Sequence, residues 1–171
     1  MITILLILSF ICQSPQAALT VETRFDEQKN LTTQSLGPVR LSGPRNRYHS
    51  LDFTLSRSYE ATASTAPDRI NFELVPVVKA RLLNSDLYVV FVIDGKQVHF
   101  SSNRSAIRNP VPGRLWIGER LIFSIPIEDF VKITNAEKLS LKMGGDVFDF
   151  DDTSRKALRV FLSAVKISEG P

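Results

Sequence analysis

The chain has 171 residues, of which 43% are hydrophobic and 23% are charged, and its formal net charge is +3 at pH 7. This composition excludes a disordered or low-complexity chain, and the lack of any repeat of about 20 to 50 residues excludes a solenoid or propeller. The small basic excess alternates with apolar residues, so we interpret it as solvated surface and expect no nucleic-acid partner. We expect a single β-rich domain over residues 19–171.

Residues 1–18 predict a secretory signal peptide. Residues 1–12 are almost continuously apolar, and a short polar stretch ending in Ala17 and Ala18 follows. An apolar run of about a dozen residues is shorter than the roughly 20 that cross a bilayer as a helix, so we expect cleavage and no transmembrane span afterwards. The single cysteine, Cys12, lies in this segment. A domain of this length that folds without disulfides favours a bacterial periplasm or envelope, and we expect a secreted or periplasmic protein.

Alternating apolar and polar residues predict antiparallel strands. The pattern runs through residues 51–55, 70–74, 121–125 and 139–143, each of which would bury one face. Pro76 cannot donate a ladder hydrogen bond, so we expect an edge strand or a bulge there. Residues 87–93 are apolar on both faces, which is typical of a central strand covered on both sides. The spacing of the turns between these runs predicts an all-β antiparallel β-sandwich, with a β-barrel as the alternative.

The pair Asp94-Gly95 predicts a tight hairpin turn, because a type I′ turn needs positive φ at both central residues. A two-residue loop would pair Phe91 with Val98 on the core side and leave His99 on the opposite face. Asp94 and His99 would then lie roughly 16 Å apart, too far to act together. The chain has one other histidine. Two histidines without a fixed spacing do not indicate a metal site.

The connection 103–120 is the best candidate for a binding surface. Trp116 lies between two glycines, where an indole serves either as a core plug or as an exposed platform for a glycan or partner. Arg108, Arg114 and Arg120 flank the same proline-stiffened loop. Because loops carried on a rigid sheet often hold binding residues, we expect any functional edge to include these four residues.

Two helical segments are predicted. A short helix follows Pro126, where Glu128 and Asp129 favour the positive end of the helix dipole. A longer amphipathic helix near the C-terminus can be capped by Asp152 or Thr153 and should pack against a sheet or close an open edge. Its apolar stripe consists of Ala157, Leu158, Phe161, Leu162 and Val165.

Four aspartates crowd residues 146–152 and raise the question of a calcium site. Counted from Asp149, the sixth loop position is Ser154 and the twelfth is Val160, where an EF-hand needs glycine and glutamate, so that site is excluded. A structural explanation is better. Gly144-Gly145 forms a turn, Phe148 and Phe150 face inward from a strand, and Asp151 or Asp152 caps the following helix.

Catalytic motifs with a recognisable spacing are missing from the sequence. It has no Gly-x-Ser-x-Gly elbow, no His-Glu-x-x-His motif, no phosphate-binding glycine loop and no cysteine beyond residue 12. We therefore expect a protein that is not an enzyme and that uses no cofactor and no metal. A hydrolase whose catalytic triad comes from distant segments is kept as an alternative.

The second half of the chain carries strand and turn segments in a fixed order. They are residues 92–96, 118–126 and 139–145, followed by the helix around residues 157–159. This order resembles that of small secreted bacterial β-domain proteins. The resemblance implies no activity and no functional residue.

These observations predict a non-enzymatic binding or structural module that acts through a loop or a sheet edge. Its partner would be another envelope protein or a cell-surface polymer. A lipocalin-like barrel that binds a small apolar ligand is the alternative, although its single tryptophan comes late in the chain. A large interior cavity would favour the barrel, and a solid core would favour the sandwich.

Overall fold

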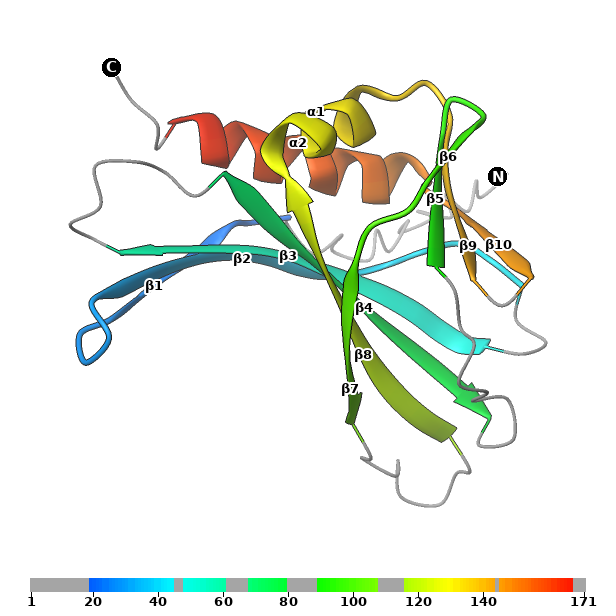
Figure 1. The fold of residues 1–171 in the computed structure, drawn as a ribbon, viewed down its shortest axis with the longest axis horizontal. Helices are drawn as coiled ribbons and strands as arrows, with labels where there is room; N and C mark the ends of the chain where they lie inside the picture. The colour runs from blue at the N-terminus through cyan, green and yellow to red at the C-terminus, as the bar shows by residue number, and fades with distance from the viewer. Residues whose placement is uncertain are drawn as a thin grey trace, which may run out of the picture.

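The chain folds into two antiparallel sheets and two helices (Figure 1). The computed structural model describes residues 19–44, 48–60, 68–79, 89–107, 116–143 and 145–167; the predicted signal peptide lies outside them. The larger sheet has six strands in the spatial order β1 (Glu22–Asp26), β2 (Leu31–Arg40), β3 (Tyr48–Glu60), β4 (Arg69–Lys79), β8 (Trp116–Pro126) and β7 (Ser102–Ile107). The smaller sheet has four strands in the order β10 (Asp146–Asp149), β9 (Leu139–Met143), β5 (Val89–Ile93) and β6 (Lys96–Val98).

The smaller sheet and both helices lie on one side of the larger sheet (Figure 1). Helix α1 (Ile127–Asn135) follows β8, and α2 (Asp152–Ile167) packs along β2. Residues of both sheets and both helices form one hydrophobic core. The second layer of the sandwich is therefore part sheet and part helix. No helix within the described residues is both long and apolar enough to span a bilayer.

Phenylalanine rings fill the space between the two sheets. Phe53 and Phe72 stack with their centroids 5.1 Å apart, and Phe91 of the smaller sheet meets Phe72 edge-on at 5.3 Å. Phe123 and Phe150 contact the same group, and all five residues are at most 4% exposed. The sandwich prediction is confirmed. The barrel alternative is wrong, because the sheets do not close on each other and these rings occupy the place of a ligand chamber.

The predicted strand patterns are confirmed, because the apolar residues of β3, β4, β8 and β9 are buried on the core side. The predicted hairpin also has the expected register, with Phe91 opposite Val98. Asp94 and Gly95 have φ values of 48° and 82° at its turn. The local turn chemistry therefore sets which face of the smaller sheet meets the core.

Pro76 lies in an interior strand, so of the two predicted alternatives the edge strand is wrong, whereas an irregularity of the bulge kind does lie next to it. On the β8 side of β4, pairing stops at Leu74 and resumes at Val77 in the same register. The ladder with β3 shifts between Tyr48 and Ser50, one pair beyond Pro76. A short gap in one ladder thus accommodates the missing N–H group inside a sheet.

Strand β5 is central in the smaller sheet, but only one of its faces is buried. Val89 and Phe91 are buried, whereas Val90 and Val92 are half-buried on the face that points away from the core. The prediction of cover on both faces is wrong. The physical reason is that α2 packs along β2 of the larger sheet, so the helix does not cover the outer face of the smaller one.

Both predicted helices are confirmed. The helix after Pro126 is nine residues long, and its buried residues include Phe130 and Ile133. The apolar stripe predicted for the C-terminal helix is buried at all five positions. In α2 this stripe meets the core-side face of the larger sheet and the ring of Phe130, which lies 6.2 Å from that of Phe161.

Candidate functional site

The candidate residues of the connection 103–120 fall only partly within the described structure. Arg108 and Arg114 lie outside the described residues, and so does the side chain of Trp116, whose backbone opens β8 opposite Lys79. Arg120 is exposed, and its Nε lies 2.6 Å from Oε1 of Glu73. Arg120 thus forms an ion pair between neighbouring strands, and the grouping of the four residues into a binding edge stays a prediction.

Asp94 has a structural partner other than His99. The backbone amide of Lys138 donates to Asp94 Oδ1 at 2.8 Å, and the amide of Asp94 donates to the carbonyl of Lys138 at 2.9 Å. These bonds join the β5–β6 hairpin to the loop before β9, while His99 is exposed. Within the described residues, no three His, Cys, Asp or Glu side chains are placed to hold a metal ion.

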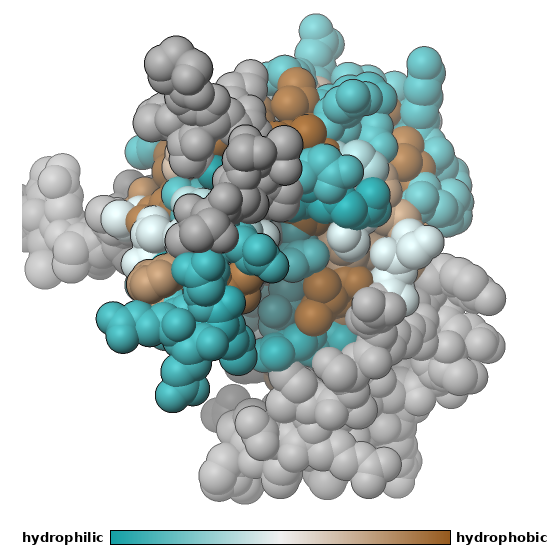
Figure 2. Space-filling model, turned by 60° about the vertical axis from the view of Figure 1, so that its left-hand side comes forward, coloured by the Kyte–Doolittle hydropathy of each residue, from teal (hydrophilic) through white to brown (hydrophobic). Residues whose placement is uncertain are grey.

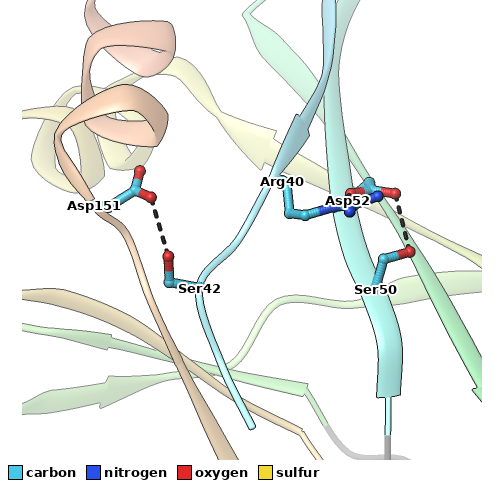
Figure 3. Close-up of polar contacts among 5 residues, drawn as sticks. All are labelled: Arg40, Ser42, Ser50, Asp52 and Asp151. Atoms are coloured by element: carbon cyan, nitrogen blue, oxygen red, sulfur yellow. Dashed lines mark hydrogen bonds and ion pairs between the residues drawn. The ribbon is translucent and has the colours of Figure 1, made fainter. Parts of the chain in front are cut away.

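The aspartate-rich segment before α2 ties the two sheets together (Figure 3). Ser42 Oγ donates to Asp151 Oδ2 at 3.0 Å, and the amide of Asp149 donates to the carbonyl of Ser42 at 2.9 Å. Asp151 Oδ1 also accepts a hydrogen bond of 2.9 Å from the amide of Ser154. Asp151 is therefore the N-cap of α2. The aspartate-rich segment had predicted Asp151 or Asp152 at this position, and the helix pattern alone had predicted Asp152 or Thr153.

The charge of Asp151 is stabilised by this cap. Burial by itself would raise the pKa of Asp151, but hydrogen bonds from the amide and hydroxyl of Ser154 and from the hydroxyl of Ser42 outweigh it, so the pKa is lowered from its ordinary value. The carboxylate is thus ionised at neutral pH and holds the start of the helix. This explains the segment as a structural joint.

The second polar cluster in Figure 3 lies across β2 and β3. Arg40 Nε donates to Asp52 Oδ1 at 3.0 Å, and Ser50 Oγ donates to Asp52 Oδ2 at 3.2 Å. Arg40 and Asp52 face each other directly in the ladder. A cross-strand ion pair accounts for this cluster.

Arg57 is a buried cation that the sequence analysis did not identify. It is 1% exposed, its Nε donates to Gln34 Oε1 at 2.7 Å, and its Nη2 donates to the carbonyl of Val165 at 3.2 Å. Its guanidinium lies 5.2 Å from the ring of Tyr59. A positive charge is favourable at the C-terminal end of a helix, so Arg57 fastens that end of α2 to the larger sheet.

An open groove of about 510 Å³ runs beside α2. It lies between residues 19–21 and the side of α2 that faces away from the core. Its apolar floor includes Leu19, Val21 and Val160, which are half-buried against the core, whereas Lys156 and Arg159 are exposed. The complete lining is Leu19, Thr20, Val21, Lys156, Arg159, Val160, Ser163 and Ala164. Both cations lie outside the apolar stripe that the sequence predicted for this helix.

Exposed hydrophobic surface is divided into separate patches on the face shown in Figure 2. Within the described residues, the exposed large hydrophobic side chains are Phe25, at 54%, and Val147, at 44%. Phe25 lies on the edge strand β1 and Val147 on β10. Isolated exposed apolar residues are common on protein surfaces, so position in the fold decides whether they matter.

No protein-family model, curated protein or solved structure matches this chain. Its function therefore has to be inferred from its own residues.

Proposed function

We propose that this protein is a secreted or periplasmic, non-enzymatic binding module, and that the groove beside α2 receives a segment of another envelope protein. The observation that carries the proposal is the composition of the groove, which combines an apolar floor with two exposed cations. The groove is a different surface from the loop with Trp116, Arg108, Arg114 and Arg120, which stays a separate candidate.

The floor of the groove favours apolar side chains on the partner. Leu19, Val21, Val160 and Ala164 present carbon atoms along one side of the helix. Removing apolar surface from water contributes about 25 cal/mol per Å². An open groove fits an extended or helical peptide segment better than a small molecule, since small-molecule sites usually enclose most of their ligand.

The rim of the groove favours acidic residues on the partner. Lys156 and Arg159 are three positions apart on α2, so they project from the same side of the helix. Opposite charges across an interface direct association and fix its register. The expected partner segment therefore carries apolar residues next to aspartate or glutamate.

A photo-crosslinking residue at Ser163 tests this proposal in the native host. Ser163 is exposed and lines the groove, and Ser58, which is also exposed but lies on β3, is the matched control position. We expect a protein adduct from position 163 and none from position 58. Reversing both rim charges, with Lys156→Glu and Arg159→Glu, should lower the adduct yield about tenfold, which corresponds to about 1.4 kcal/mol.

Val160→Asn separates a protein partner from an anionic polymer, because it makes the floor polar without adding a charge. A peptide that uses the apolar floor should lose its adduct with this variant, whereas a polymer held by charge alone should not. Equal adduct yields at positions 163 and 58, or an adduct that the charge reversal leaves unchanged, would overturn the groove as the binding site. Unchanged thermal unfolding of each variant shows that the loss is not caused by misfolding.

A further inference from the structure

Among the described residues, strand β1 is an edge of the larger sheet with no strand on its outer side. It is the terminal strand, it pairs with β2 on one side, and all five of its residues are exposed. An edge strand presents unpaired N–H and C=O groups that can pair with another strand.

The side chains of β1 alternate between an aromatic side and a charged side. Phe25 faces Thr32, which in turn faces Tyr59, so Phe25 shares the core-side face of the sheet. The other face carries Glu22, Arg24 and Asp26. Charges of alternating sign along a strand can complement a second copy of the same strand when the two run antiparallel.

We propose that β1 pairs with β1 of a second copy of this chain, antiparallel and centred on Phe25. In this register the two Phe25 rings lie opposite each other, and Arg24 of each copy lies opposite Asp26 of the other. The Arg24 side chain is 82% exposed and that of Asp26 is 45% exposed, and each already lies near an opposite charge of its own copy, at 3.5 Å and 3.6 Å. The pairing joins the two larger sheets into one continuous sheet.

Neighbouring registers satisfy these side chains less well. Centring the pair on Arg24 places arginine against arginine and Glu22 against Asp26, which is repulsive. Centring it on Thr23 places Arg24 opposite Glu22 but leaves Phe25 opposite Val21, which is already half-buried against its own core. The register centred on Phe25 is favoured because it covers two exposed rings and forms two Arg24–Asp26 pairs.

The paired area is small, so the dimer should be weak and its population should depend on concentration. Sedimentation velocity on the purified protein, over a wide concentration series, should show a monomer–dimer equilibrium. Asp26→Arg should weaken it about tenfold, because the two-fold symmetry turns both attractive pairs into repulsive ones. Phe25→Ser should weaken it by a similar factor.

The double variant Arg24→Asp with Asp26→Arg is the decisive measurement. It exchanges the two charges and restores both pairs, so its dimer should return to within about threefold of the parent. Lys142→Glu is the control, since Lys142 is an exposed charge on β9, away from β1, and the dimer should be unchanged.

Three results would overturn the proposal: a monomer at every concentration, a dimer that Phe25→Ser and Asp26→Arg leave unchanged, or a dimer lost in Glu22→Arg but kept in Asp26→Arg. The last result would assign the register centred on Thr23. Because β1 is exposed, all variants should keep the parent's thermal unfolding when measured as monomers. The crosslink expected at Ser163 does not depend on any of these outcomes.

Discussion

The middle of the larger sheet and its β1 end carry aromatic residues on the same face, but only the middle is covered. Phe72 in β4 is fully buried, whereas Phe25 in β1 is 54% exposed. The smaller sheet and the helices cover β2, β3, β4 and β8, whose core-side residues belong to the hydrophobic core, and no residue of β1 does. The alternation along a strand therefore determines which face of the sheet a residue occupies. The smaller sheet and the helices determine whether that face is buried.

Phe72→Ala is expected to have the largest effect on folding. The ring contacts three other phenylalanines, so its loss leaves a cavity and should lower the free energy of unfolding by about 3–5 kcal/mol. Phe25→Ala should lower it by less than about 0.5 kcal/mol, because the ring is largely in water. Urea unfolding of both variants measures the contrast. Similar losses for the two would mean that β1 is covered after all.

Arg57 lies in β3, between the buried middle of the larger sheet and its exposed β1 end. Arg57→Ala should lower the free energy of unfolding by about 2–4 kcal/mol, because Gln34 and the carbonyl of Val165 lose their buried donor. Arg69→Ala is the control, since Arg69 is exposed and bonds Ser124 at the surface. If the two alanine variants unfold at the same urea concentration, Arg57 does not fasten the helix.

Asp151→Ala tests the joint between the two layers. Losing the N-cap and the bond from Ser42 should lower the free energy of unfolding by about 1 kcal/mol at neutral pH. Because the pKa of Asp151 is lowered in the folded protein, its contribution is complete above the ordinary aspartate pKa and is lost as the pH falls through the folded value. The difference from the parent should therefore shrink in acid. Asp152→Ala, one position into the helix, should show a smaller difference at neutral pH.

The ion pair of Arg120 and Glu73 should have the smallest effect, because it lies on the face of the larger sheet opposite the core and the Arg120 side chain is exposed to solvent. A double-mutant cycle with Arg120→Gln and Glu73→Gln should give a coupling of about 0.2–1 kcal/mol. The coupling should fall further at high salt, which screens exposed charges. A coupling well above this range, unaffected by salt, would show that Arg120 is buried by a partner.

Elements with strong local signals could be predicted from the sequence. The Asp94-Gly95 turn and the alternation in 51–55, 70–74, 121–125 and 139–143 each depend on residues close together in the chain, and the structure confirms them. The β1–β2 hairpin was not predicted, because its exposed charged strand carries no clear apolar alternation. In the sheet, β2 of this hairpin pairs with β3, a contact between residues far apart in the chain.

The candidate sites could not be predicted, because distant residues define them. Arg57 continues the inward positions of 51–55, yet its burial depends on Gln34 and on Val165 at the end of α2. The groove joins residues 19–21 to the outer side of α2, which by itself has the pattern of a solvated surface. Asp151 was one of the predicted cap residues, but its hydrogen bond from Ser42, just after β2, joins residues 109 positions apart and could not be predicted.

The two sheets are connected differently at their two sides, and the bridge between Ser42 and Asp149 lies at one of them. At one margin the sheets are joined by the chain itself, since residues 99–101 run from β6 directly into β7. At the other margin the chain does not connect the sheets directly, and hydrogen bonds of Ser42 with Asp149 and Asp151 join them. Gly43, next to Ser42, packs closely against Phe148 at this side, because a Cβ atom there would lie 2.2 Å from the Phe148 ring. If the sheets separate at this margin, the backbone amide of Asp149 loses its acceptor, the carbonyl of Ser42, and its hydrogen should exchange faster than those of the central strands.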